Sequence, residues 1–238
     1  PCMRCNERIK FAALLEKALA LGFDAVATGH YASIVTGPDG SRELHRSAAW
    51  AKDQSYVLGV LTAEQLQHAM FPLGATPSKD EVRAEAAERG LTVAQKPDSY
   101  DICFIPDGDT RGWLADRVGT APGEVVERDG TVVGSHEGAT GYTVGQRRGL
   151  ALGRPAPDGK PRFVLEIRPK DNTVVVGPKE ALAVTSMSGS RFTWAGTAPA
   201  DPATPFACDV QIRAHADPVP ATARVQDDVL VIDVDEPL

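Results

Sequence analysis

The feature that most constrains the fold is a change of pattern near Pro106. Before this residue, apolar stretches with helical spacing alternate with stretches typical of strands. After it, short β-branched runs are separated by Gly, Pro and Asp-Gly turns. The first pattern predicts an α/β domain with a parallel sheet over 1–106. The second predicts a small β-rich domain over 107–180 and an incomplete C-terminal β-barrel over 181–238.

Local signals predict where several elements begin and end. Asn6 is a candidate N-cap for a helix that Gly22 ends. The segment 24–36 is typical of a buried strand, and Pro-Asp-Gly at 38–40 predicts a hairpin. Ser78 followed by Glu81 predicts a capping box for a helix that reaches Glu88 and stops at Gly90. The stretches KDQSYVLGVL and TAEQLQHAM are typical of helices.

Composition limits the class of protein. The chain has 238 residues, a formal net charge of −7 and four cysteines, too few for a disulfide scaffold. The longest apolar stretch is interrupted by Glu16 and Lys17, so we expect no membrane span and a cytoplasmic location. Residues 145–170 hold seven basic and two acidic residues by count. This stretch is either a local polyanion-binding patch or a solvated hairpin face.

The cysteines are the first candidates for chemistry. Cys2 and Cys5 form a CxxC pair, which suits zinc, an iron–sulfur cluster or a dithiol switch. No second ligand pair stands at short spacing, so zinc is disfavoured. Cys103 adds a third thiol, which is either a buried structural residue, a cluster ligand or a partner in sulfur chemistry. Cys208, in an alternating strand pattern, is expected to pack inside the sheet.

Three polar motifs follow apolar or glycine-containing stretches. TGHY at 28–31 ends an apolar strand, where α/β sheets bind ligands, although a histidine there is often only structural. KDQSY at 52–56 is rich in hydrogen-bonding groups, or is a helix start capped by Asp53. GYTVGQRRGL at 141–150 sets Gln146 and two arginines between glycines, which suits phosphate and base contacts.

Together these motifs resemble one known family. The stretches PCMRCN, ATGHYA, KDQSYVLG, FPLG, DICFIP, YTVGQRRGL and VVVG occur in the order and spacing of the bacterial tRNA-specific 2-thiouridylases. The resemblance is densest in 1–106 and 141–150, and weakest after about residue 185. It implies an N-type ATP pyrophosphatase domain, of which 1–106 is the C-terminal half, then a central β-rich tRNA-binding domain and a C-terminal β-barrel.

The resemblance also implies an activity. Members of this family thiolate the wobble uridine of tRNA, using ATP with Mg²⁺ and a sulfur that a donor or cysteine desulfurase delivers as a persulfide. Cys5 matches the nucleophilic cysteine and Cys103 the persulfide carrier. Gly29 matches a backbone contact to ATP. The positions that match tRNA contacts are Pro1, Cys2, His30, Lys52, Asp53, Gln54, Arg213 and Ala214.

The sequence departs from the family pattern in three ways. The glycine- and serine-rich phosphate loop of the family is expected before Pro1, and its closing barrel motif is expected after Leu238. We therefore expect the chain to be an internal piece of a longer protein, without catalytic turnover of its own. The family tends to have Tyr where Ala214 stands, and Asp is common at Cys2. Two alternatives stay open: a [4Fe-4S] cluster on Cys2, Cys5 and Cys103, and a non-catalytic tRNA-binding module.

Overall fold

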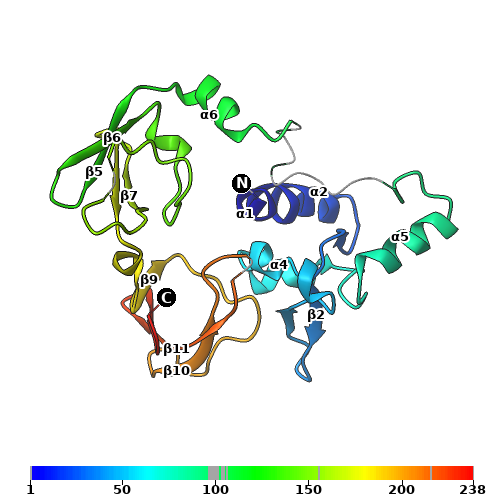
Figure 1. The fold of residues 1–238 in the computed structure, drawn as a ribbon. Coiled ribbons are helices and arrows are strands. Elements are labelled where there is room, and N and C mark those ends of the chain that lie inside the picture. The colour runs from blue at the N-terminus through cyan, green and yellow to red at the C-terminus, as the bar shows by residue number, and fades with distance from the viewer. Residues whose placement is uncertain are drawn as a thin grey trace. The chain divides into compact units, whose positions relative to one another are not determined.

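The computed structural model describes residues 2–95, 102, 105, 107–154, 156–214 and 216–237 (Figure 1). It divides into two compact units. Unit 1 comprises Pro1–Asp98 and Ser186–Glu236, and unit 2 comprises Ser99–Thr185 and Pro237–Leu238. The predicted three-part division with boundaries near 106 and 180 stays a prediction.

Unit 1 combines short helices with three small sheets. Its helices are α1 (Cys2–Cys5), the π-helix η1 (Asn6–Ala13), α2 (Leu14–Ala20), the 3₁₀-helix η2 (Trp50–Lys52), α3 (Ser55–Leu58), α4 (Ala63–Gln67) and α5 (Lys79–Glu88). Its strands are β1 (Val26–Ala27), β2 (Ser33–Thr36), β3 (Arg42–His45), β4 (Ala69–Met70), β9 (Ser186–Ser190), β10 (Phe206–Val210), β11 (Val219–Gln226) and β12 (Val229–Val234).

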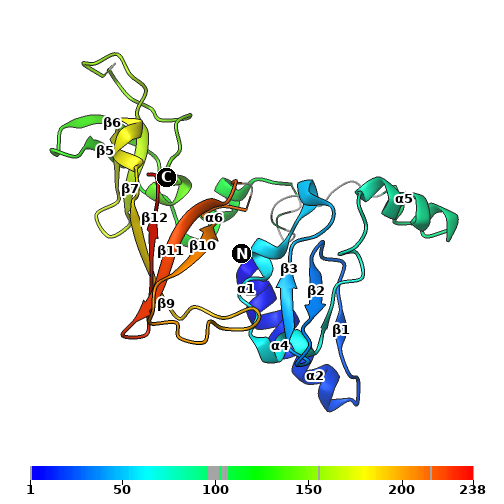
Figure 2. The ribbon, with the colours of Figure 1, turned by 90° about the horizontal axis from the view of Figure 1, so that it is seen from below.

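The α/β character predicted for the N-terminal part is confirmed. Strands β1 and β4 pair in parallel, with Val26 opposite Ala69 and Ala27 opposite Met70. Strands β2 and β3 form an antiparallel hairpin, which Figure 2 shows beside the N-terminal helices. The buried residues Phe11, Ala32, Leu58, Leu61, Leu66, Ala69 and Phe71 form the core shared by these elements. This core positions the carboxyl end of β1 against the first helix.

The first helix begins earlier than the capping signal predicts. Helical structure runs from Cys2 through Ala20, and Cys5, which precedes Asn6, already has helical dihedral angles. The prediction of Asn6 as an N-cap is therefore wrong. Asn6 is 1% exposed, and its side-chain amide donates to the carbonyl of Val57 at 2.9 Å. A tertiary contact thus uses the side chain that the local pattern assigned to the helix end.

Other local signals meet mixed outcomes. Gly22 (φ 85°) follows the helix end as predicted, and the tip of the β2–β3 hairpin contains Gly40 (φ 82°). Ser78 accepts from the Glu81 amide and α5 ends at Glu88, which confirms that helix. The single strand predicted over 24–36 is wrong, because β1 and β2 belong to different sheets. Asp53 is not the helix cap, since Gln54 holds that position before α3.

Strands β9 to β12 form one antiparallel sheet in the order β10-β11-β12-β9. The tight β11–β12 turn uses Asp227 and Asp228 in the left-handed region, with φ of 49° and 61°. Aspartate tolerates these angles better than most residues do. The predicted strands are confirmed, whereas the described residues form an open four-stranded sheet, so the barrel itself stays a prediction.

Unit 2 is a small mixed structure built around one sheet. Its elements are α6 (Thr110–Val118), β5 (Gly123–Glu127), β6 (Val132–His136), the 3₁₀-helix η3 (Ala139–Gly141), β7 (Phe163–Arg168), β8 (Thr173–Gly177) and the 3₁₀-helix η4 (Lys179–Leu182). The strand order is β6-β5-β8-β7, with β5 and β8 parallel. The β-branched run of β8 is buried along the strand, which suits its central place.

Helix α6 is a feature that the sequence reading missed. The Asp-Gly signal at 107–108 predicts a turn, but the side chain of Asp109 accepts from the amide of Gly112 at 2.9 Å and caps the helix start. The side-chain oxygen of aspartate accepts a backbone hydrogen bond both in turns and at helix N-caps. The same residue pattern therefore predicts either structure. No helix among the described residues has the length and apolar character needed to cross a membrane.

Candidate functional site

The two N-terminal cysteines lie on one helix. Cys2 and Cys5 are one turn apart, so they share a face. Cys2 is exposed and Cys5 is half-buried, and both are thiols. The helix is fixed by Asn6, which reaches Val57, and by the Gln65 side-chain amide, which donates to the carbonyl of Phe11 at 2.6 Å. Tertiary contacts on its buried side therefore hold the thiol-bearing face outward.

The segment Thr28–Tyr31 follows the carboxyl end of β1. Gly29 is exposed there, and a side chain added to it would make only an ordinary contact with Leu73 at 3.9 Å. Packing therefore does not require glycine at this position. An exposed backbone at the end of a parallel strand is where α/β sheets approach ligands.

His30 is fixed between the first helix and this strand end. Its Nε2 atom lies 3.4 Å from the ammonium of Lys10, and its Nδ1 atom lies 2.7 Å from the hydroxyl of Thr28. Because an ammonium can only donate, Nε2 accepts and Nδ1 carries the proton that is donated to Thr28. The ring also packs edge-on against Phe71, with centroids 6.0 Å apart. His30 thus acts chiefly as a link in the structure.

Burial and the nearby Lys10 lower the pKa of His30 from 6.5 to about 4. Burial is the larger cause, because it disfavours the charged imidazolium. His30 is therefore neutral at physiological pH. Any contact that it makes with a phosphate group would be a hydrogen bond and not an ion pair.

The segment 52–54 divides into structural and exposed groups. The carboxylate of Asp53 accepts from the Ser47 amide at 2.7 Å and from the Ser55 hydroxyl at 2.6 Å, and its side chain is 8% exposed. The side-chain oxygen of Gln54 accepts from the backbone amide of Tyr31 at 3.0 Å. The backbone amide of Gln54 donates to the carbonyl of Tyr31 at 2.8 Å. Lys52 is exposed. These bonds join the segment 52–54 to the segment 28–31.

The loop that follows β10 is tied to the same region. The guanidinium of Arg46 donates to the side chain of Gln211 at 2.7 Å, and the hydroxyl of Tyr56 donates to the carbonyl of Ile212 at 3.1 Å. Gln211 in turn donates to the carbonyls of Arg213 and Ala214 at 2.9 and 3.1 Å. The exposed pair Arg213–Ala214 is therefore held by residues beside the segment 52–54.

Arg46 and Tyr56 are the residues that the sequence reading missed. Arg46 also lies over the ring of Trp50 at 4.5 Å and within 3.8 Å of the Asp53 carboxylate. Tyr56 belongs to the KDQSY motif, and that motif was the one sequence signal that pointed to its role. Nothing near Arg46 in the sequence indicated its role, because its partner Gln211 is 165 positions away.

In unit 2 the GYTVGQRRGL loop is built around its own glycines. Gly145 and Gly149 have φ of 85° and 73°. The side chain of Gln146 accepts from the Thr143 amide and donates to the Arg148 carbonyl, so it closes the turn. Arg147 and Arg148 are exposed. The loop therefore offers the two arginines outward, while the glutamine serves its shape.

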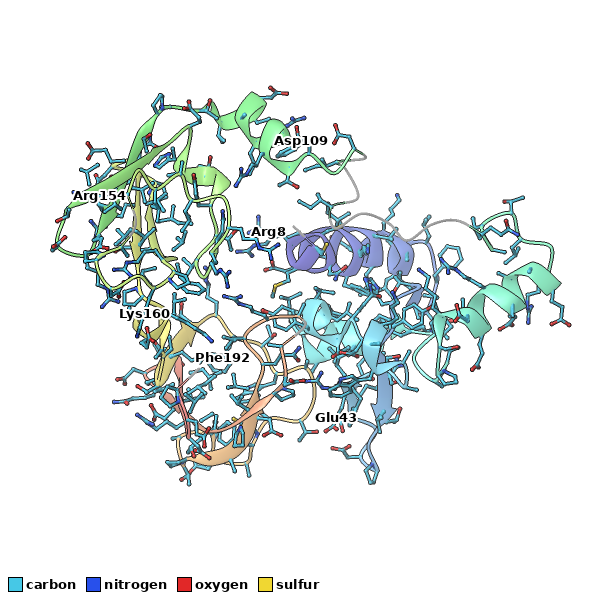
Figure 3. All side chains as sticks on the ribbon, viewed as in Figure 1. Arg8, Glu43, Asp109, Arg154, Lys160 and Phe192 are labelled. Atoms are coloured by element: carbon cyan, nitrogen blue, oxygen red, sulfur yellow. The ribbon has the colours of Figure 1, made fainter. Side chains whose placement is uncertain are left out.

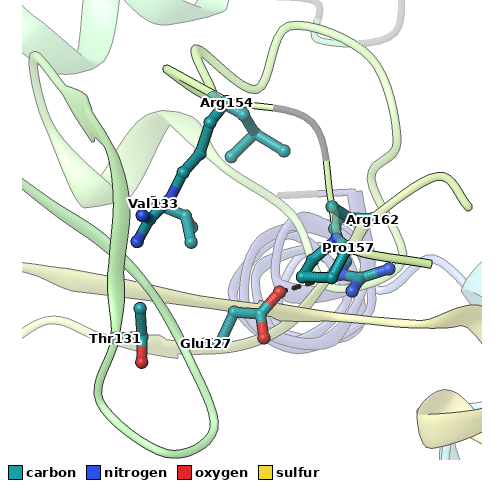
Figure 4. Close-up of a pocket in the computed structure, with 8 residues that line it drawn as sticks. Glu127, Thr131, Val133, Arg154, Pro157 and Arg162 are labelled. Atoms are coloured by element: carbon teal, nitrogen blue, oxygen red, sulfur yellow. Dashed lines mark hydrogen bonds and ion pairs between the residues drawn. The ribbon is translucent and has the colours of Figure 1, made fainter. Parts of the chain in front are cut away.

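A pocket of about 230 Å³ lies in unit 2 next to this loop's sheet (Figure 4). Arg162, whose side chain is 7% exposed, donates to Glu127 at 3.0 Å and to Asp158 at 2.8 Å. Arg154 donates to the carbonyl of Val132 at 3.1 Å. The charge of the buried Arg162 is therefore already matched by two carboxylates and is not available to a ligand.

Three of the seven basic residues in 145–170 pair with carboxylates within unit 2. Besides Arg162, Arg168 makes a bidentate contact with Glu166 at 2.9 Å, and Lys160 lies 3.8 Å from Glu180. At these three residues, the pairs favour the interpretation of a solvated hairpin face. At the exposed arginines of the GYTVGQRRGL loop, a polyanion-binding patch stays a prediction.

Two predicted site residues, Pro1 and Cys103, lie outside the described residues. The third thiol of the cluster alternative is therefore outside them too. Within the described ranges, no group of three or more His, Cys, Asp or Glu side chains is placed to hold a metal ion. The described site residues all lie in unit 1, where the bonds above connect their segments.

Comparison with known proteins gives consistent matches. Residues 1–107 match the family model described as the tRNA methyl transferase HUP domain, and residues 111–178 match the tRNA methyl transferase PRC-barrel domain. A relative from Leifsonia xyli subsp. xyli, named tRNA-specific 2-thiouridylase MnmA, is 76% identical over all 238 residues. A protein of the same name from Clavibacter sepedonicus is 76% identical over 94% of the chain.

The chain spans only part of these relatives. It covers 65% of the Leifsonia protein and 57% of the Clavibacter protein. A third relative of the same name, from Arthrobacter sp. (strain FB24), is 68% identical over 95% of the chain, which covers 60% of that protein. With both domain models matched in order and these identities, the chain belongs to the tRNA-specific 2-thiouridylase family.

Proposed function

We propose that the protein is a tRNA-uridine 2-sulfurtransferase, which replaces the C2 oxygen of the wobble uridine by sulfur at the expense of ATP. Its partners are tRNA and a sulfur donor, either a relay protein or a cysteine desulfurase. Relatives that are up to 76% identical carry the name tRNA-specific 2-thiouridylase. The activity of the whole protein is proposed from this similarity and from the site in unit 1.

One observation carries the proposal. Four segments far apart in the sequence, namely 2–10, 28–31, 46–56 and 211–214, are joined in unit 1 by specific hydrogen bonds. These segments contain every described residue that matches a catalytic, ATP or tRNA position of the family. The arrangement would let one bound tRNA contact the thiol-bearing helix and the three polar segments.

The chemistry assigns a role to each thiol. The uracil C2 carbonyl is a poor electrophile, so its oxygen is first joined to the α-phosphorus of ATP, and pyrophosphate leaves. The terminal sulfur of a persulfide on Cys103 then attacks C2, and AMP leaves with the oxygen. Attack of the Cys5 thiolate on the remaining Cys103 sulfur releases the thiolated base and forms a Cys5–Cys103 disulfide, which an external thiol reduces.

The carboxyl end of β1 suits the approach of a nucleotide. Gly29 presents its backbone at the carboxyl end of β1, where a nucleotide can approach without steric cost. Mg²⁺ bound with ATP would act on the phosphates of the nucleotide. It would supply neutralisation of phosphate charge.

The test measures 2-thiouridine by mass spectrometry in tRNA. A protein extended to the full length of its relatives is given ATP, cysteine and a cysteine desulfurase. We expect Cys5→Ser and Cys103→Ser to lower the thiolation rate by about 10³-fold or more, because each removes a nucleophilic sulfur. Cys208→Ser is the matched control. Burial raises the pKa of the Cys208 thiol, which lies in β10, so we expect unchanged thiolation.

Two other functions would give different results. If colour and iron accompany activity after anaerobic purification, and metal-free protein does not thiolate, the site is a cluster on Cys2, Cys5 and Cys103. If the extended protein binds tRNA but forms no 2-thiouridine under any of these conditions, it is a binding module. Normal thiolation by Cys5→Ser would contradict the assignment of the nucleophile.

A further inference from the structure

A second pocket, of about 800 Å³, opens beside Cys2 in unit 1. Its lining combines the first helical turn, including Cys2 and Arg4, with Val57 and Val60 and with the segment Ser190–Thr193 that follows β9. Its size is within the range of about 300–1,000 Å³ that ligand pockets have. The C-terminal part of the chain thus contributes side chains next to a thiol at the N-terminus.

The segment after β9 is held against the helical part by two bonds. The hydroxyl of Thr193 donates to the carbonyl of Gly59 at 3.0 Å, and the amide of Leu44 donates to the carbonyl of Ala195 at 2.8 Å. Phe192, labelled in Figure 3, is half-buried and packs edge-on against Trp194 with centroids 5.4 Å apart. Its ring is therefore a supported apolar wall of the pocket.

Arg191 has an unusual backbone. Its φ is 57°, in the left-handed region. The other non-glycine residues with positive φ in the described ranges are Asn172, Asp227 and Asp228, which are types that tolerate it. An arginine held there costs conformational energy that a glycine would avoid. Strained residues of this kind gather at binding sites, which makes the Arg191 side chain a candidate binding group.

Charge at the pocket is not balanced. Arg4 is matched by Glu7, whose carboxylate lies 2.6 Å away. Arg191 is exposed, and the described residues offer its guanidinium no carboxylate within ion-pair distance. The positive charge of Arg191 therefore has no matching carboxylate among the described residues, and it lies at a pocket also lined by Phe192 and two valines. Phosphate with an unpaired base is the chemistry that matches this combination, since bases stack on aromatic side chains and phosphates pair with arginine.

We propose that the pocket beside Cys2 holds an unpaired nucleotide of the RNA substrate, with its base against Phe192 and a neighbouring phosphate at Arg191. The inference rests on the proposed function for the identity of the RNA. It adds two residues, both from the C-terminal part, to the positions that bring the target base near Cys2 and Cys5. A docking site for the protein that delivers sulfur is the competing use of this surface.

The direct test uses an anticodon stem–loop carrying 5-iodouridine at the wobble position, which crosslinks to nearby aromatic side chains on irradiation. With the extended protein, we expect the crosslinked peptide to contain Phe192. Phe192→Leu keeps an apolar side chain for folding and should remove most of this crosslink. Crosslinks confined to other peptides, together with normal tRNA binding by Phe192→Leu, would overturn the proposal.

Arg191→Gly separates binding from folding. Glycine relieves the left-handed strain, so the melting temperature should stay the same or rise. The tRNA dissociation constant should increase about 5- to 50-fold, and the salt dependence of binding should lose about one phosphate contact. The matched controls are Arg89→Ala on α5, where the side chain is 68% exposed, and Phe23→Leu, where Phe23 is 62% exposed. Both should bind tRNA normally.

The outcomes distinguish this proposal from the proposed function. Normal thiolation and tRNA affinity in both pocket variants would sink the nucleotide site and leave the activity intact. A Phe192 crosslink without any 2-thiouridine product would keep the site and sink the activity. Normal tRNA affinity with slower loading of sulfur from the desulfurase would reassign the pocket to the donor protein and overturn the nucleotide site.

Discussion

The two units differ in how far along the chain their side-chain contacts reach. In unit 2, Arg168 pairs with Glu166 two positions away, and Arg162 pairs with Asp158 and Glu127, four and 35 positions away. In unit 1 Arg46 reaches Gln211, which is 165 positions away, and Tyr56 reaches Ile212, which is 156 positions away. Near pairs stabilise a local shape, whereas distant ones assemble separate segments into one surface. The difference indicates why the candidate site lies in unit 1.

The largest effect on stability is expected at Asp53 in unit 1. Asp53→Ala leaves the amide of Ser47, a residue that is 5% exposed, without its acceptor and removes the partners of Ser55 and Arg46. We expect a loss of about 3 kcal/mol in the free energy of unfolding, measured with urea. Hydrogen exchange should show the loss in segments 46–56 and 211–214.

Asp39→Ala is the matched control for that comparison. Asp39 also accepts from a serine amide and a serine hydroxyl, those of Ser41, but at the exposed tip of the β2–β3 hairpin. Water replaces these bonds there, so the loss should be much smaller. An equal loss in both variants would show that burial and distant assembly do not distinguish Asp53.

Arg162 is the counterpart in unit 2. Arg162→Ala leaves Glu127 and Asp158 without their buried cation. We expect a loss of roughly 2 kcal/mol, below the value for fully buried pairs, because both carboxylates are partly exposed. Hydrogen exchange should show lost protection in β5, β7 and β8 of unit 2, while unit 1 should keep its exchange protection. Arg168→Ala, an exposed bidentate pair, should change little.

His30 gives the smallest of these effects, through pH. Its pKa is about 4 in the folded protein and 6.5 ordinarily, so the unfolded chain binds the proton more readily. The stability that neutral His30 contributes is complete above about pH 6.5 and declines as the pH falls towards 4. We expect the free energy of unfolding to fall by about 1–2 kcal/mol over this pH range, after allowance for the partial exposure of His30. The variant His30→Asn should show a smaller decline over the same range.

Nuclear magnetic resonance checks the His30 prediction directly. The Cε1 proton of His30 should titrate with a midpoint near pH 4, well below that of an ordinary histidine. A midpoint near 6.5 would mean that His30 is open to water and available as a cation. In that case His30 would offer an exposed positive charge at the end of β1, as Arg147 and Arg148 do in unit 2.

The sequence predicted elements whose cause is local. Ser78 caps α5 through one side-chain bond to a residue three positions on, and Gly22 and Gly40 have the positive φ that turns need. The strands of the second half follow β-branched runs. The errors have one physical reason. Asn6 and Asp53 have good capping side chains, yet their bonds go to distant or buried groups, namely Val57 and Ser47.

The candidate site could be predicted in its residues but not in its arrangement. Motif resemblance selected the segments around Cys5, Gly29, Lys52 and Arg213 without showing that they meet. It did not select Arg46, whose bond to Gln211 helps join them, or Arg191, whose left-handed backbone appears only in three dimensions. Long-range contacts of single side chains leave no periodic trace in a sequence.

The sequence by itself determined the fold class, the family and the residue types available for sulfur chemistry, because periodicity, turn residues and motif order are local properties. The tertiary structure decided which of those residues work as supports. It turned Asn6 and Asp53 inward to hold other segments, and it placed Phe192 beside Cys2. Burial and distant hydrogen bonding, which depend on the whole fold, made that choice.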